Sequence, residues 1–279
     1  MEFRSPEAED RYAALVAHAS RAVVGLDFDG TLSPIVDDPA EAHIHPDAGE
    51  VLVDLAEVVA AVAVITGRPA RQVLALGGLD DIGNTIGEHG RELHLFGQYG
   101  FERWSSTRRR IVSPRPPHGL SSFLGRLPGV LRRAGAAEAH IEEKVLADAV
   151  HTRRLADPAA AYERLLPEIR ALAADHGLVV EPGRMVIEAR SPGMDKGTVV
   201  RTLVEELDAG AFLFVGDDLG DLEAFEAVAE LREQGMPTLL VCSLSTEQSA
   251  LQELADVTVK GPDGVLDLLR RLTHDARSA

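Results

Sequence analysis

Two short apolar runs, one toward each end of the chain, are each followed directly by closely spaced aspartates. The first reads AVVGLDFDGT (22–31) and the second reads AFLFVGDDLGD (211–221). Runs of β-branched and aromatic residues that end at Gly and Asp predict buried strands of a parallel sheet leading into loops. Carboxylates this close together raise one another's pKa unless a cation neutralises them, so these strand ends restrict both the fold and its chemistry.

Strand and helix patterns alternate in both outer parts of the chain. After residue 31 we expect a helix in 47–59, a strand in 61–69, a short helix and then a third strand in 84–93. From residue 195 we expect helix, strand, helix, strand and a final helix. This alternation predicts an α/β core with a parallel, Rossmann-like sheet that carries helices on its faces.

The middle of the chain differs in texture from these flanks. Clustered arginines and prolines in WSSTRRRIVSPRPPHG (104–119) are typical of a solvated linker. Beyond it we expect a helix interrupted near Pro128, two strands, a second helix, and a hairpin with its Pro-Gly turn at 182–183. The sequence therefore predicts a catalytic core formed by 1–107 and 191–279, and an inserted α/β cap at 108–190.

Composition excludes several classes of function. The 279 residues include 45 acidic and 28 basic side chains, a net charge of −17. A general nucleic-acid or membrane-surface binder would need a basic face, so we expect neither partner. The single cysteine, Cys242, allows no intrachain disulfide and lies in an apolar run, which favours a buried structural thiol. With a charged, acidic start unlike a signal peptide, we expect a cytoplasmic protein.

Four short motifs fall where loops leave the carboxyl ends of expected core strands, which is where open α/β sheets bind ligands. They are DFDGT (27–31), TGR (66–68), DKG (195–197) and GDD (216–218). Asp27 can act as a nucleophile and Asp29 as an acid/base, while Thr66 and Lys196 can hold phosphoryl oxygens. A Mg²⁺ ion suits an oxygen-only site of this kind, held by Asp27, Asp29 and Asp217 with Asp218 and Asp221 as further candidates.

Each motif alone has an ordinary structural explanation. D-x-D-G occurs in turns, TGR at strand ends, DKG at capped helix starts and GDD in turns; an EF-hand is excluded because no further acids follow at the required spacing. All four in this order favour the catalytic interpretation. Together they resemble the haloacid dehalogenase (HAD) superfamily of aspartyl phosphatases, whose capped members carry an α/β cap, here of C2B type, between the second and third motifs.

A narrower resemblance is to the trehalose-6-phosphate phosphatases. It lies in GEHGRELH (87–94), IEEKVLADAVHTR (141–153), RMVIEARSPGMDKG (184–197) and GDDLGDLEAF (216–225). It implies Mg²⁺-dependent hydrolysis of trehalose 6-phosphate through an aspartyl-phosphate, the last step of trehalose biosynthesis. It also implies that the substrate is bound by Arg68 of the core and by polar residues of the cap, namely Glu142, Lys144, Arg153 and Glu188.

Several of these assignments have structural alternatives. The alternating Glu142, Lys144, His151 and Arg153 could form one solvated strand face with cross-strand ion pairs. Arg68 could bind phosphate or sugar, or pair with nearby acids. His89 could be structural or contact substrate, and Asp218 could bind metal or orient Lys196.

Other functions compete with this one. A related capped phosphatase could act on mannosyl-3-phosphoglycerate or sucrose phosphate. An inactive regulatory module that binds a trehalose-phosphate synthase is a third alternative, disfavoured because Asp27, Asp29, Lys196 and Asp217 are all intact. Functional pairing of an active enzyme with such a synthase is also compatible with the sequence.

Overall fold

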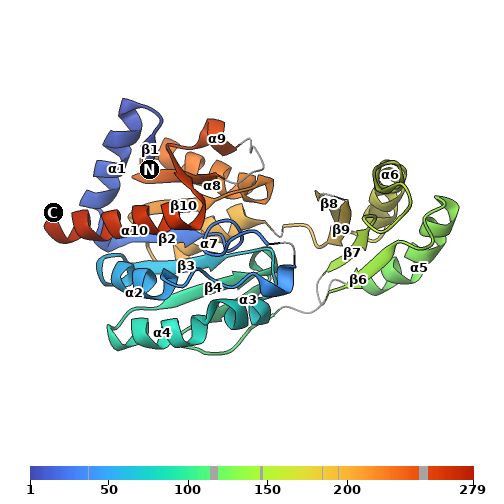
Figure 1. The fold of residues 1–279 in the computed structure, drawn as a ribbon, viewed down its shortest axis with the longest axis horizontal. Coiled ribbons are helices and arrows are strands. Elements are labelled where there is room, and N and C mark those ends of the chain that lie inside the picture. The colour runs from blue at the N-terminus through green and yellow to red at the C-terminus, as the bar shows by residue number, and fades with distance from the viewer. Residues whose placement is uncertain (37, 114–118, 145–146, 184, 194, 245–250) are drawn as a thin grey trace. The chain divides into compact units, whose positions relative to one another are not determined.

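The computed structural model describes residues 1–279 except 37, 114–118, 145–146, 184, 194 and 245–250. The chain divides into two compact units, one formed by Met1–Ser113 with Asp195–Ala279 and the other by Pro114–Met194 (Figure 1). Both ends of the chain therefore contribute to one unit, here called the core, and the middle of the chain forms the second, here called the cap.

The core is built on an eight-stranded sheet whose order is β1-β12-β11-β10-β2-β3-β4-β5. Its strands are β1 (Glu2–Phe3), β2 (Ala22–Leu26), β3 (Ala61–Ile65), β4 (Leu93–Gly97), β5 (Glu102–Ser105), β10 (Ala211–Gly216), β11 (Thr238–Leu244) and β12 (Val257–Lys260). The six inner strands are parallel, and β1 and β5 pair antiparallel at the two edges. From β2 the chain proceeds outward through β3 and β4, and its later part proceeds outward from β10 in the opposite direction. The order of the strands thus reverses between β2 and β10.

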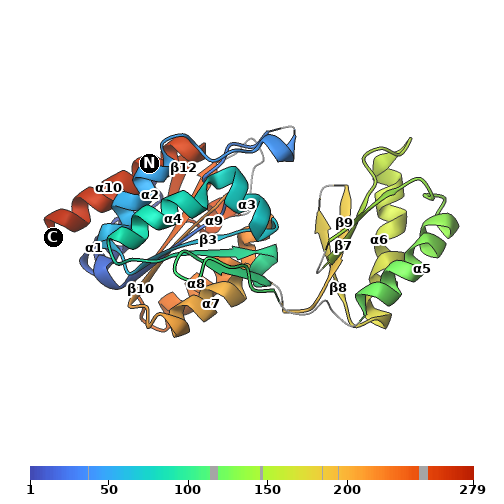
Figure 2. The same ribbon diagram turned by 90° about the horizontal axis from the view of Figure 1, so that it is seen from below.

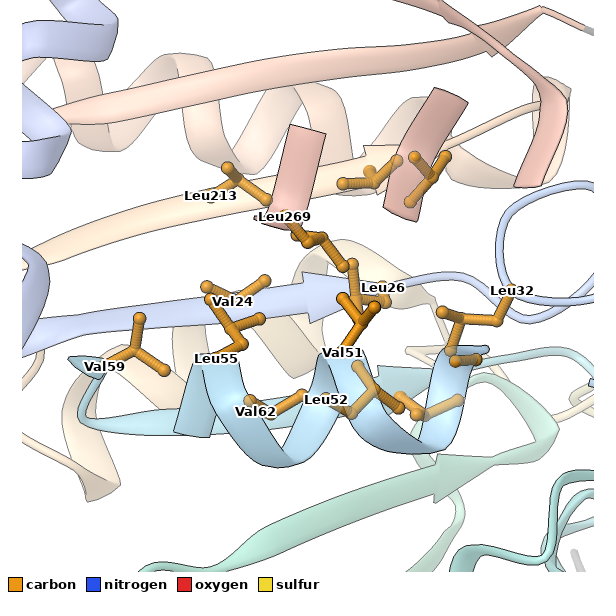
Figure 3. Close-up of a cluster of buried hydrophobic side chains, with 14 of the residues drawn as sticks. Val24, Leu26, Leu32, Val51, Leu52, Leu55, Val59, Val62, Leu213 and Leu269 are labelled. Atoms are coloured by element: carbon orange, nitrogen blue, oxygen red, sulfur yellow. The ribbon is translucent and has the colours of Figure 1, made fainter. Parts of the chain in front are cut away.

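Helices cover both faces of this sheet (Figure 2). One face carries α1 (Pro6–Ala17), α2 (Ala48–Val58), α3 (Ala70–Gly77), α4 (Leu79–Glu88) and α10 (Gly261–Ser278); the other carries α7 (Lys196–Glu206), α8 (Leu222–Glu233) and the short α9 (Leu251–Leu254). Figure 3 shows the first face, where Leu52 and Leu55 of α2 and Leu269 of α10 pack on Val24 and Leu26 of β2. Strand residues are buried on both faces, as the unbroken apolar runs predict.

Four local expectations are wrong. Trp104 and Ser105, expected in a solvated linker, are buried in edge strand β5, because Trp104 packs into the core. Residues 84–88, expected as part of a strand, end helix α4, because Leu79, Gly83 and Ile86 are buried at helical spacing after Gly78 (φ +57°) closes α3. Helix α5 (Leu120–Arg133) continues through Pro128 without interruption. Pro182 and Gly183 lie inside strand β8 (Val179–Gly183) and not in the hairpin turn; β8 is an edge strand, where a proline is tolerated.

The cap has the expected order of helix, two strands, helix, two strands. Its sheet has the order β6-β7-β9-β8, formed by β6 (His140–Glu143), β7 (Ala147–His151), β9 (Val186–Arg190) and β8. Helices α5 and α6 (Pro158–Asp175) pack on one face through a core that includes Phe123, Ile169, Val150 and Ile187. The two helices lie on the same side of the sheet in Figure 2.

Short 3₁₀ turns join several core elements, namely Ala19–Arg21, Pro39–Glu41 (η2), Gln98–Gly100 (η3) and Leu219–Asp221 (η4). Among the described residues, none of the helices combines the length and the apolarity that crossing a bilayer requires.

Candidate active site

The candidate site lies at the carboxyl ends of β2, β10 and β3, beside the reversal of strand order. Asp27 directly follows β2, Asp217 follows β10 and Thr66 follows β3, and these three strands are neighbours. The backbone N–H of Asp27 still donates to the carbonyl of Val215 at 2.9 Å, so the ladder between β2 and β10 fixes its position. Side chains from distant parts of the sequence therefore meet where open α/β sheets bind their ligands.

Three buried carboxylates form the centre of the site. Asp27, Asp217 and Asp221 each present an oxygen within 4.8 Å of the others, and their exposed fractions are 5%, 5% and 0%. Among the described residues, this is the group of acids whose geometry could hold a metal ion. Carboxylate oxygens gathered in this way are ligands that Mg²⁺ accepts.

Lys196 neutralises only part of this charge. Its ammonium donates to Asp27 Oδ1 at 2.5 Å and to Asp221 Oδ1 at 2.6 Å, and the residue is 3% exposed. Lys196 is the first residue of α7, whose start is capped by the Asp195 side chain accepting from the N–H of Thr198 at 2.6 Å. Three carboxylates and one ammonium leave a net charge of −2 when all are ionised, which a divalent cation or two protons would compensate.

The pKa values follow from this excess of negative charge. Burial raises the pKa of Asp27 well above its usual value; Lys196 opposes this rise and Asp221 and Asp217 add to it. Burial, then Asp218 and Asp221, raise the pKa of Asp217 to about 8. Burial would lower the pKa of Lys196, but Asp221 and Asp27 outweigh it and keep the amine charged. Without a metal ion, the raised pKa values favour protonated forms of Asp27 and Asp217, and a bound cation could replace these protons.

Asp221 organises the loop that follows β10. Its Oδ2 accepts from the backbone N–H of Asp217 at 3.0 Å and of Asp218 at 3.4 Å, while its Oδ1 accepts from Lys196. The Asp218 side chain accepts from the N–H of Gly220 at 2.8 Å and completes a reciprocal capping box on η4. The acids that receive the hydrogen bonds of Lys196 are therefore Asp27 and Asp221.

The DFDGT loop approaches Asp217 closely, and only glycine permits this approach. Gly30 has φ +70°, and a Cβ at this position would overlap the carboxylate of Asp217. The Gly30 carbonyl accepts from the buried hydroxyl of Ser243 at 2.6 Å, which ties the loop to β11. Gly30 therefore permits the close approach of the loop to Asp217, and the hydrogen bond from Ser243 holds the loop there.

Thr66 is buried, and its hydroxyl oxygen accepts from the N–H of Arg68 at 3.1 Å. The TGR loop is held by the segment after β4. Gln98 N–H donates to the Arg68 carbonyl at 2.9 Å, and Tyr99 N–H donates to the Thr66 carbonyl at 3.0 Å. Gln98 and Tyr99 both have positive φ (+47° and +57°), a strained conformation for non-glycine residues that is kept only where the surroundings enforce it.

Arg68 contacts Asp29 directly. Its Nε donates to Asp29 Oδ2 at 2.6 Å and its Nη2 to Asp29 Oδ1 at 2.7 Å, while its Nη1 donates to the Pro39 carbonyl at 2.6 Å. The sequence left three roles open for Arg68: binding phosphate, binding sugar, or pairing with a nearby acid. The structure shows the ion pair, and the acid is Asp29. The Asp29 side chain is bound by this guanidinium and does not belong to the group of Asp27, Asp217 and Asp221.

The cap presents its polar residues on the sheet face opposite its helices. Strand register aligns Glu142, Ala149, Glu188 and Glu181 in one row across the four strands. Lys144 donates to Glu188 at 2.5 Å, and His151 contacts Glu142 at 2.8 Å. A cross-strand ion pair of the kind expected for a solvated face, Lys144 with Glu188, is thus present among the residues that the resemblance assigns to the sugar.

The remaining sequence candidates lie elsewhere. Arg153 is exposed, two residues beyond β7. His89 caps the end of α4 and lies 3.5 Å from Glu57; it precedes the start of β4, whereas the acid cluster lies at the carboxyl ends of the parallel strands. Cys242 is buried in β11.

Sequence reasoning did not identify two sets of contacts, one in the core and one in the cap. One is the support of the TGR loop by residues 96–102, in which Glu102 Oε2 also accepts from the N–H of Ala70 at 2.6 Å, at the start of α3. The other is the ion pair of Glu181 with Arg190 at 2.7 Å, on the polar face of the cap. Period-two alternation from Glu188 could have found Arg190, whereas no local pattern marks the loop contacts.

Comparison with known proteins gives the family. The family model described as trehalose-phosphatase matches residues 25–260, which include every core motif above. The chain belongs to the trehalose-phosphatase family. A trehalose-phosphate phosphatase of Mycobacterium avium is 32% identical over 255 residues, covering 83% of this chain and 61% of the relative. An uncharacterized glycosyl hydrolase of Mycobacterium tuberculosis is 35% identical over 236 residues, covering 80% of this chain and 17% of the relative.

This family member therefore spans about three fifths of the former relative and about a sixth of the latter. Solved structures share its fold. The C-terminal domain of Candida albicans trehalose-6-phosphate phosphatase has a TM-score of 0.73 at 21% identity and covers 96% of each chain. A haloacid dehalogenase-like hydrolase from Bacteroides thetaiotaomicron has a TM-score of 0.64 at 15% identity, covering 90% of this chain and 99% of that one. The fold is that of a capped HAD hydrolase.

Proposed function

We propose that the protein is a Mg²⁺-dependent phosphatase that hydrolyses trehalose 6-phosphate to trehalose and phosphate. The observation that carries this proposal is the buried group of Asp27, Asp217 and Asp221 with Lys196 between two of its members. Family membership supports the substrate, since the relatives are named trehalose-phosphate phosphatases.

The reaction proceeds in two steps on Asp27. An oxygen of Asp27 attacks the phosphorus, the bond from phosphorus to the sugar oxygen breaks, and Asp29 gives its proton to that oxygen. A water molecule then attacks the phosphorus of the aspartyl-phosphate while Asp29 takes its proton. The bond from phosphorus to Asp27 breaks, so phosphate leaves and both carboxylates return to their starting states. Splitting the reaction in this way replaces one difficult displacement by two easier ones.

Thr66 and Lys196 bind the phosphoryl group. The Thr66 hydroxyl already accepts from a backbone N–H, so its proton is free to be donated to a phosphoryl oxygen. Lys196 keeps its charge because of Asp27 and Asp221, and it stabilises negative charge that develops on the phosphoryl oxygens.

The donor set fits a Mg²⁺ ion. Asp27, Asp217 and Asp221 offer oxygen ligands, and their uncompensated charge of −2 matches a divalent cation. When bound, the ion supplies positive charge that balances the acids and the incoming phosphate. Asp29 is placed differently, because its side chain is held by Arg68.

The cap unit supplies specificity in this proposal. Glu142, Lys144, Arg153 and Glu188 offer donors and acceptors of both signs, which suit the hydroxyl groups of a disaccharide. Glu142 and Glu188 are 46% and 13% exposed at their side chains, and both lie on the face that the cap helices leave uncovered. A phosphatase for mannosyl-3-phosphoglycerate or sucrose phosphate would use the same core with a different cap preference.

The chemistry is tested by phosphate release from trehalose 6-phosphate. Asp27→Asn is expected to lower kcat by several orders of magnitude while circular dichroism and the melting temperature show a folded protein, because the attacking anion is removed. Asp10→Asn, which neutralises an exposed acid on α1, is the matched control and is expected to be fully active. Excess chelator should abolish activity and Mg²⁺ restore it. Retention of a tenth of the wild-type kcat in Asp27→Asn would exclude the assignment.

Substitutions in the cap test the identity of the substrate. Glu142→Ala and Glu188→Ala should each lower kcat/KM for trehalose 6-phosphate by a factor that corresponds to about 1–3 kcal/mol, because polar groups of the bound sugar would lose their partners. They should leave p-nitrophenyl phosphate, which lacks the sugar, nearly unchanged. Glu143→Ala is the control, since Glu143 neighbours Glu142 on β6 but lies on the other face of the sheet. Equal losses with both substrates would show that these residues do not read the sugar.

Synthase pairing stays a proposal. A Candida albicans trehalose synthase regulatory protein domain shares the fold at 12% identity, with a TM-score of 0.66. The intact acid cluster and Lys196 support catalysis over a purely regulatory role. Co-purification with a synthase in the absence of phosphate release would favour the regulatory alternative.

A further inference from the structure

The Arg68 side chain makes three hydrogen bonds within the core. Two of its nitrogens form a parallel pair with the two oxygens of Asp29, at 2.6 and 2.7 Å, and a third donates to the Pro39 carbonyl at 2.6 Å. The side chain is 14% exposed, whereas that of Asp29 is 37% exposed. The guanidinium is therefore less exposed than the carboxylate that it binds, and each of its three nitrogens already donates to an acceptor of the core.

The backbone of Arg68 is also fixed. Its N–H donates to Thr66 Oγ1 at 3.1 Å, and its carbonyl accepts from Gln98 N–H at 2.9 Å. A guanidinium anchored at its backbone and at Pro39 presents a rigid fork. Such a fork matches both oxygens of a carboxylate and restricts the side-chain torsions of its partner, which a lysine cannot do with a single ammonium.

We infer that Arg68 is a positioning residue that acts through Asp29, and that it contacts neither the sugar nor the phosphate. This inference rests on the proposed acid/base role of Asp29. Proton transfer requires heavy atoms within hydrogen-bond reach, so a carboxylate free to rotate would spend much of its time away from the reacting oxygen. The fork of Arg68 holds Asp29 in one orientation while Asp29 keeps lone pairs directed away from Arg68.

A double-mutant cycle separates positioning from direct contact. Wild type, Arg68→Met, Asp29→Asn and the double variant are assayed with Mg²⁺ on phenyl phosphate, which has no sugar for Arg68 to contact. Acid/base catalysis contributes roughly 10²–10⁴-fold, so Asp29→Asn should lower kcat by at least about 100-fold. Arg68→Met should lower kcat about tenfold or more in wild type with little change in KM. In the Asp29→Asn background it should lower kcat less than about twofold.

Two further variants keep the test interpretable. Arg68→Lys retains the charge without the fork and should give a kcat between those of wild type and Arg68→Met; it replaces Arg68→Met in the cycle if that variant does not fold. Arg201→Met is the matched control. Two nitrogens of Arg201, on α7, also donate to one carboxylate, that of Glu230 on α8, at 3.3 and 2.7 Å. The Arg201→Met variant should change kcat less than twofold.

The inference is overturned if Arg68→Met lowers kcat by the same factor in both backgrounds, since Arg68 would then act independently of Asp29. It is also overturned if Arg68→Met raises KM and leaves kcat unchanged, since that result means a direct contact with substrate. Failure of the proposed function would appear separately, as activity retained in Asp27→Asn. An additive cycle together with an inactive Asp27→Asn would reject only the role of Arg68.

Discussion

Asp148 should make the stability of the cap fall as the pH rises. This residue lies in β7 on the face that packs against α5 and α6, as the burial of its neighbour Val150 in the cap core indicates. It is 2% exposed, and its Oδ2 has no hydrogen-bond partner among the described residues. Burial, and then the charge of Glu143, raise the pKa of Asp148 from 3.8 to about 6. A buried carboxyl with an unpaired oxygen is therefore more readily accommodated in the folded cap when it is protonated.

The magnitude follows from this pKa. In the unfolded chain Asp148 loses its proton near pH 4, whereas the folded cap retains it until about pH 6. Between these values the folded state binds more protons than the unfolded state, so the free energy of unfolding decreases as the pH rises. A difference of roughly two pKa units corresponds to about 3 kcal/mol, lost between pH 4 and pH 6 and constant above that.

Asp148→Asn removes the titration and keeps the shape. The amide brings its own cost of about 1–3 kcal/mol for an unsatisfied buried group, but that cost does not vary with pH. The quantity to compare is therefore the pH dependence of stability and not stability at one pH. Relative to wild type, the variant should gain about 2 kcal/mol in the free energy of opening the cap between pH 4.5 and pH 6.5, an order-of-magnitude figure from the same pKa difference.

Native-state hydrogen exchange can measure this for each unit of the intact chain. Amides of β7 and α6 report the cap, and amides of β2 in the core serve as an internal control. Glu143→Gln should weaken the pH dependence, because the neighbouring charge contributes to the raised pKa. If wild type and Asp148→Asn show the same change in cap protection with pH, the burial argument for Asp148 is wrong.

Three further outcomes are expected at the acid cluster. Burial and the neighbouring acids raise the pKa of Asp217 to about 8 without metal and raise that of Asp27 as well, so Mg²⁺ binding near pH 7 should release at least about one proton and weaken roughly tenfold or more per pH unit below 8. Calorimetry in buffers of different ionisation enthalpy tests this, and an affinity that is constant from pH 6 to 8 would contradict it. Lys196→Met should cost about 3–5 kcal/mol in the free energy of unfolding, since it leaves two buried carboxylates without their cation, and urea denaturation with no loss would refute the pairing. Gly30→Ala should reduce Mg²⁺ affinity and kcat together, because a Cβ at φ +70° overlaps Asp217; a variant with wild-type affinity and kcat would show that the loop need not approach so closely.

Much of the core fold could be predicted from the sequence because its strands are buried on both faces. Such strands appear as unbroken apolar runs, and the motifs that follow β2, β3 and β10 mark their carboxyl ends. One exception was α4, because residues 84–88 were expected in a strand and burial at helical spacing after Gly78 decided otherwise. Local propensity is weak compared with the packing of an apolar face.

Residue types and their order along the chain were enough to predict that Asp27, Lys196 and Asp217 come close together, since parallel strands bring their carboxyl ends to one edge of a sheet. The pairing of these charges was decided by the tertiary structure. Asp221, about 190 residues from Asp27, shares Lys196 with it, and Arg68 binds Asp29 across 39 residues of sequence. Hydrogen bonds depend on distances of a few tenths of an ångström and on direction, and these are set by how whole elements pack and not by any pattern in the chain.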